Sequence, residues 1–172
     1  MAKIIDLERI NGLTPDQVQS LLKPIPVGSI AKVFEFCQKK LRNAILDADS
    51  ARRAANIQRT EFYRSQLEKS EREAEEWSER KEYARRILLA TIEKWDEVSL
   101  SVVALGKDGP TLAKFAFKVL VRKIGELPLE ELEKITTEKT KDPIIIRAAL
   151  EAQVEIARIR EIQKELGLRP SS

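Results

Sequence analysis

The chain has 172 residues, 42% hydrophobic and 34% charged, and its 31 Lys and Arg against 28 Asp and Glu leave a net charge of +3, which is typical of a folded rather than a disordered chain. The absence of histidine excludes Ser-His-Asp and Cys-His relays and histidine-liganded metals, and a single cysteine, Cys37, excludes an internal disulfide and a four-cysteine zinc site. We therefore predict no catalytic residue, no metal ligand and no cofactor.

Residues 1–28 are predicted to form a lead-in with one short helix. Thr14 offers a capping hydroxyl, Pro15 fits the first helical position, and Gln17 stands three residues after the cap. Pro24 and Pro26 force extended backbone on the residues before them, so the helix is expected to end there.

Residues 29–97 are predicted to form a long helical arm beginning at Ser29 and ending near Asp96. The chain has neither Gly nor Pro between Gly28 and Gly106. Apolar residues repeat every seven positions in two sets, as in a coiled coil: Phe34, Leu41, Ala48, Ala55, Phe62, and between them Ile30, Cys37, Ala44, Ala51. Cys37 lies on this seam, which indicates a small core side chain rather than a nucleophile.

The charges of the arm favour a hairpin. Residues 39–64 carry seven basic against three acidic side chains, and residues 68–82 carry four basic against seven acidic ones. If the arm folds back around residues 66–74, opposite charges face each other; if it stays straight, the same polarity guides pairing with another copy. We predict a long antiparallel helical hairpin, with a coiled-coil-like rod as the alternative.

Residues 98–172 are predicted to form a smaller helical portion that packs on the arm, so that the chain is a single structural unit. Residues 98–102 and 114–119 alternate as strands do, which leaves an α+β fold with a β-hairpin around residues 98–122 as an alternative. Pro110 in a first turn and Gly125 at a C-terminus favour a helix instead. The predicted class is therefore all-α.

The last two predicted helices have clearer signals. One follows Pro128 and covers residues 129–135. The other begins at Asp142 and Pro143, a cap and a first-position proline, and stops at Gly167. Its apolar stripe is Ile145, Ala149, Ala152, Ile156, Ile159 and Leu166.

Two sets of residues are candidate contact sites. Arginines bind phosphate through a planar fork of donors, so a nucleic-acid backbone is a possible partner of the arginine face, defined as Arg42, Arg52, Arg53, Arg59 and Arg64. Trp77 lies in a charged stretch, where an exposed indole indicates a protein interface, and Phe62 is a second interface candidate. Trp95 continues an apolar stripe and is predicted to be core.

Three other sequence patterns give weaker evidence for a functional site. Asp47 and Asp49 diverge by about 200° on a helix and cannot easily hold one Mg²⁺. Residues 106–111 have the composition of a phosphate loop without its spacing. A cationic stripe of Lys114, Lys118 and Arg122 is typical of side chains that reach water from a buried helix.

We predict a non-enzymatic helical interaction or assembly module that binds a second copy of itself or another protein through its long helices. The alternative is a nucleic-acid-binding protein that uses the arginine face. No window approaches the roughly 20 apolar residues of a membrane span, and no signal-peptide pattern is present, so we expect a cytoplasmic chain without a membrane partner. Three Asn residues beside abundant Lys, Glu and Arg are compatible with a heat-adapted source.

Overall fold

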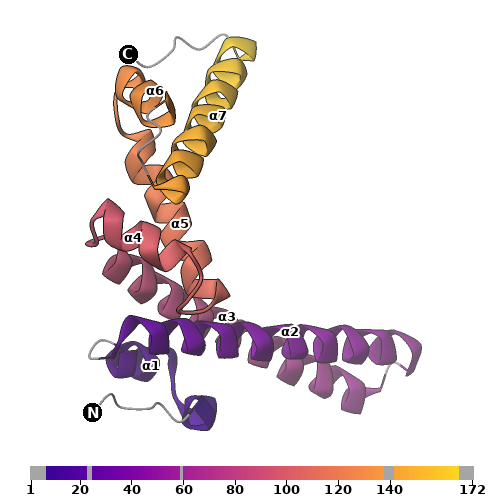
Figure 1. Cartoon of the computed structure of the whole chain (residues 1–172). Helices are drawn as coiled ribbons and strands as arrows, with labels where there is room; N and C mark the ends of the chain where they lie inside the picture. Colours follow the sequence, from indigo (N-terminus) through magenta and orange to yellow (C-terminus); the bar gives the residue numbers. More distant parts are fainter. Residues whose placement is uncertain (1–6, 23–24, 59, 138–141, 167–172) are drawn as a thin grey trace. The chain divides into compact units, whose positions relative to one another are not determined.

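A computed structural model of the chain describes residues 7–22, 25–58, 60–137 and 142–166 (Figure 1). Every secondary-structure element of these residues is a helix, which confirms the predicted all-α class. The chain divides into two compact units, residues 1–91 and 92–172. The alternative β-hairpin around residues 98–122 was wrong, because this segment forms the helices α4, Glu97–Ala104, and α5, Pro110–Gly125.

The first unit begins with a short 3₁₀ helix, η1, Leu7–Gly12, and with α1, Pro15–Leu22. The predicted capping box is present: the Thr14 amide donates to Gln17 Oε1 at 2.9 Å, and the Gln17 amide donates to Thr14 Oγ1 at 3.4 Å. Ile10, Val18 and Leu22 are fully buried, so this lead-in belongs to the core of the unit.

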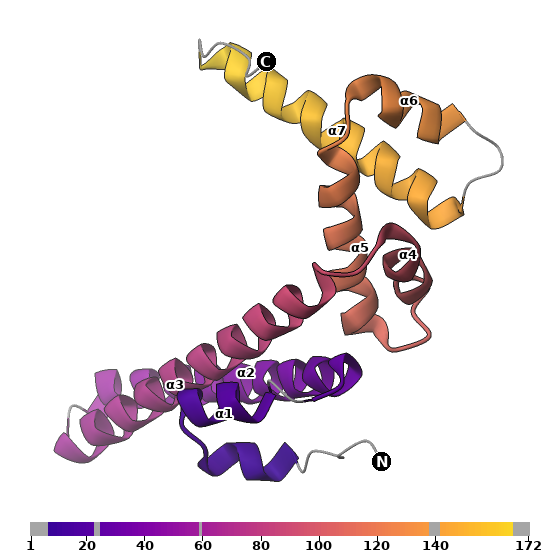
Figure 2. The same cartoon turned by 90° about the vertical axis from the view of Figure 1, so that its left-hand side faces the viewer.

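The rest of the first unit is a hairpin of two long helices, α2, Val27–Gln58, and α3, Glu61–Ile92. The helices run side by side in opposite directions (Figures 1 and 2). The seam of Ile30, Cys37 and Ala44 is buried as predicted. The helix starts two residues before the predicted Ser29, because the Pro26 carbonyl already accepts the amides of Ser29 and Ile30.

The position of the hairpin turn was predicted wrongly. Residues 66–74 lie inside α3, and the chain reverses between Gln58 and Glu61. The Thr60 carbonyl accepts the Arg64 amide at 3.2 Å, and Glu61 places an acid in the first turn of α3, where the helix dipole favours it. Residues 66–74 hold mostly good helix formers and no Gly or Pro, so nothing local stops the helix there.

The second unit begins with α4 and α5. The Asp96 side chain caps α4 by accepting the Ser99 amide at 2.7 Å, and this hydrogen bond lowers the pKa of Asp96. The turn before α5 uses Gly106 and Gly109, whose φ values of 89° and 108° other residues rarely adopt. Pro110 is the first residue of α5, as predicted, whereas Gly125, predicted as the C-terminal cap, is the last helical residue and Glu126 is the cap.

The second unit ends with α6, Leu129–Thr137, and α7, Pro143–Glu165, both close to their predicted positions. Asp142 caps α7 by accepting the Ile144 amide at 2.8 Å, and its other oxygen accepts a hydrogen bond from Ser101 Oγ on α4 at 2.9 Å. The core of this unit includes Leu100, Leu112, Ala116, Leu120, Ile124, Leu132, Ala149 and Ala152. Packing of the C-terminal portion on the arm stays a prediction.

Candidate functional site

The arginine face is divided by the fold. Arg42 and Arg53 are exposed on α2, Arg64 is exposed on α3, and Arg59 lies outside the described residues. Arg52 Nη2 contacts Glu71 Oε1 across the hairpin at 2.8 Å, and Arg52 Nη1 lies 3.6 Å from Asp49 Oδ1. Glu71 raises the pKa of Arg52. The predicted facing of opposite charges is thus present at this pair, and it neutralises one arginine of the candidate phosphate-binding face.

The two interface candidates differ in exposure. Trp77 is only 3% exposed, so the prediction of an exposed indole was wrong. The hairpin brings α2 over it, and its ring meets the Phe36 ring edge-on at a centroid distance of 6.0 Å. Phe62 is 64% exposed beside the turn and stays an interface prediction. Trp95, expected in the core, is half-buried.

Arg80 accounts for the burial of Trp77 within the charged stretch. Its guanidinium lies 4.6 Å from the Trp77 ring centroid, its Nε donates to the Leu13 carbonyl at 2.9 Å, and its Nη2 contacts Glu76 at 3.1 Å. One buried cation therefore ties the lead-in to α3 and shields the indole from water.

An apolar stripe runs along α7. Neighbouring helices cover its first half, and its C-terminal half is exposed. We call it the α7 stripe; its spacing alternates between four and three residues, and its members are Ile145, Ala149, Ala152, Ile156, Ile159, Gln163 and Leu166. Gln163 is its one polar member, and Leu166 is the C-terminal cap of the helix. Ala149 and Ala152 are buried, Ile156 is half-buried, Ile159 is 55% exposed and Leu166 is 67% exposed.

The reason for this change is the length of the neighbouring helices. Both α5 and α6 pack on α7, and Figure 2 shows the last turns of α7 extending beyond α6. Where α6 and α7 lie together they border an open groove of about 450 Å³, lined by Leu129, Glu133, Ile156, Arg160 and their neighbours. The uncovered half of the stripe continues from this groove.

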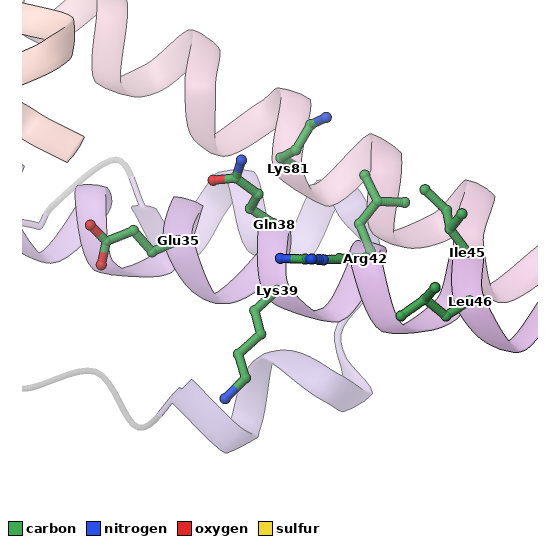
Figure 3. A pocket seen from close by; sticks show the side chains of 8 residues that line it. Glu35, Gln38, Lys39, Arg42, Ile45, Leu46 and Lys81 are labelled. Atoms are coloured by element: carbon green, nitrogen blue, oxygen red, sulfur yellow. The ribbon is translucent and has the colours of Figure 1, made fainter.

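A second groove, the α2 groove, runs along α2 (Figure 3). It has a volume of about 550 Å³ and is lined by Glu35, Gln38, Lys39, Leu41, Arg42, Ile45 and Leu46 of α2 and Lys81 of α3. Intervals of three and four residues place most of these on one side of the helix. Ile45 and Leu46 are 47% and 57% exposed. The groove was not predicted from the sequence, although the spacing of Arg42, Ile45 and Leu46 outside the seam indicates it.

The remaining candidates are structural. Burial raises the pKa of the Cys37 thiol from 9.0 to about 11, so a thiolate nucleophile is disfavoured. Lys114 and Lys118 are exposed on α5, and Arg122 contacts Glu93 at 3.0 Å. Within the described residues no three His, Cys, Asp or Glu side chains converge as a metal ion requires. None of the helices in that part of the chain is long and apolar enough to cross a membrane.

Comparison of the chain with protein-family models, with curated proteins and with solved structures found no match. Among the exposed apolar surfaces of the described residues, the α2 groove and the C-terminal half of the α7 stripe are two candidate contact sites.

Proposed function

We propose that this protein is a non-enzymatic helical interaction module that associates with a second copy of itself through the C-terminal half of the α7 stripe. The observation that carries the proposal is the exposure of Ile159 and Leu166 on a stripe whose earlier members are buried or half-buried. A stripe of this period is what one helix offers to another, and leaving its large side chains in water costs the burial energy they could gain.

The geometry favours an antiparallel pair. The first half of the stripe is already covered by α5 and α6 of the same copy, so a parallel partner helix would have to occupy their place. In an antiparallel pair over residues 156–166, Ile156 of one copy meets Leu166 of the other, and the two sets of covering helices lie at opposite ends. The two copies then use the same surface, as a two-fold interface requires.

Sedimentation velocity over a range of concentrations tests the proposal. The natural chain is expected to show a concentration-dependent dimer, and the double substitution Ile159→Glu with Leu166→Glu is expected to remain monomeric. The matched control is Leu150→Glu with Val154→Glu, which changes two equally exposed apolar residues on the opposite side of α7 and should leave the dimer intact.

A chain that stays monomeric at every concentration would overturn the proposal, and so would equal loss of the dimer in both double variants. Titration of the same samples with duplex and single-stranded nucleic acid tests the alternative role of the arginine face. For that role, binding should weaken steeply with salt and be lost on charge reversal of Arg42 and Arg53.

A further inference from the structure

The lining of the α2 groove combines apolar and cationic side chains. Leu41, Ile45 and Leu46 supply the apolar surface. Lys39 and Arg42 on α2 and Lys81 on α3 also line the groove, with Ile45 and Leu46 toward one end in Figure 3, and Glu35 is the one carboxylate in the described lining. The groove therefore carries three positive charges against one negative charge.

The three cations are available to a ligand. Arg52, Arg80, Arg85, Arg86 and Arg122 each form an ion pair. Lys39, Arg42 and Lys81 form none with another described residue. An opposite charge brought to these cations therefore displaces no ion-pair partner among the described residues, so its attraction is not offset by a lost contact there.

From this charge pattern we infer that the α2 groove binds an amphipathic helix of a partner protein, with an apolar stripe flanked by Asp or Glu. The inference extends the proposed function, because it names the chemistry of a second partner at a different surface. The groove spans residues 35–46 of α2, about 17 Å at about 1.5 Å per residue, which matches about three turns of a bound helix. The apolar side chains of the lining favour such a helix over a nucleic-acid backbone, which has no side chains to bury there.

A display library provides the test. The peptides are designed as short amphipathic helices with a fixed Leu stripe and with Glu, Lys or Ser randomised at the flanking positions, and the full-length protein is the bait. Selected peptides are expected to be enriched in Glu. Ile45→Ser with Leu46→Ser is expected to weaken their binding at least about tenfold, since both side chains lose their apolar contacts.

Charge reversal sharpens the test. The triple variant Lys39→Glu, Arg42→Glu and Lys81→Glu is expected to lose the acidic peptides and to select Lys-rich ones. The matched control reverses three exposed cations elsewhere, Lys69→Glu, Arg72→Glu and Lys134→Glu, with the same change in net charge and no expected loss. Circular dichroism of each variant checks that its helices are retained.

Three results would overturn the inference: no selected peptide, selected peptides without Glu enrichment, or equal binding by the groove variant and the control. Binding of single-stranded DNA that competes with the peptides and ignores the Ile45 and Leu46 substitutions would assign the groove to phosphate instead. None of these results bears on the α7 dimer, because its sedimentation test uses other residues. Either proposal can therefore be contradicted without affecting the other.

Discussion

The α2–α3 hairpin and α7 both carry an apolar stripe of helical period, but the hairpin covers more of its stripe than α7 does. In the hairpin, small residues such as Ala44 and Ala48 let α3 approach α2. The seam residues Ile30, Cys37, Ala44 and Ala48 are buried, whereas Phe34 and Leu41 are half-buried. In α7 the same kind of stripe is buried at Ala149 and Ala152 and open at Ile159. Periodicity thus predicts which side of a helix packs, and the length of the neighbouring helix decides how far that packing extends.

The largest expected loss of stability follows substitution of Trp77, a buried ring of the hairpin. Trp77→Ala should lower the free energy of unfolding by about 3–5 kcal/mol, because it removes a buried ring between Phe36 and Arg80. Chemical denaturation followed by circular dichroism measures it. Trp95→Ala, at a half-buried site, serves as the comparison and should cost less. Equal losses at both sites would contradict the difference in burial.

The two halves of the α7 stripe should respond differently to a change of size. Ala152→Leu adds volume where α7 approaches Gly125 of α5 and is expected to cost about 1–3 kcal/mol. Ile159→Ala, in the open half, should stay within about 0.5 kcal/mol of the natural chain when unfolding is measured at low protein concentration. A larger loss of stability for Ile159→Ala than for Ala152→Leu would show that the open half of the stripe is covered within one copy.

The buried Cys37 thiol makes the stability of the hairpin depend on pH in the alkaline range. The pKa of Cys37 is raised by burial from 9.0 to about 11 in the folded state. Between these values the unfolded chain releases the thiol proton while the folded chain retains it. The contribution of the thiol to the free energy of unfolding is therefore complete below pH 9 and falls as pH rises toward 11. Cys37→Ala should flatten this decline, measured as the difference between the two unfolding curves at each pH. Parallel curves would contradict burial of the thiol.

The smallest effect is expected at the exposed pair across the hairpin. A double-mutant cycle with Arg52→Ala and Glu71→Ala should give a small favourable coupling that decreases with added salt, because both side chains are solvated. Coupling that is independent of salt would show that this contact is more shielded than its exposure indicates.

Much of the fold follows from local signals in the sequence. Thr14 with Gln17, Pro110, Pro128 and Asp142 with Pro143 each mark a helix start, and the structure places helices there. The position of the hairpin turn could not be predicted from the sequence. The seven-residue period continues in phase from Ala55 to Phe62 and conceals the reversal of the chain between them. Thr60 is the one local signal of that turn, and an isolated Thr is a weak one.

The candidate sites were harder to predict, because exposure is a property of packing between helices. Trp77 has charged neighbours in sequence, yet α2 and Arg80 cover it in space. Ile159 has the same spacing as the buried Ala152, yet it lies past the helices that bury Ala152. The cations of the α2 groove come from two helices, so only the hairpin brings Lys81 to Lys39 and Arg42.

Disulfide cross-linking of a cysteine in the open half of α7 tests the central claim most directly. An antiparallel pair over residues 156–166 is centred at residue 161. Ile162 borders the stripe, three residues after Ile159 and four before Leu166, so in such a pair it lies near the two-fold axis. In a Cys37→Ala background, mild oxidation of Ile162→Cys is expected to give a covalent dimer, whereas Leu150→Cys on the opposite side stays monomeric. A monomeric Ile162→Cys chain, or equal cross-linking at both positions, would contradict self-association through the α7 stripe.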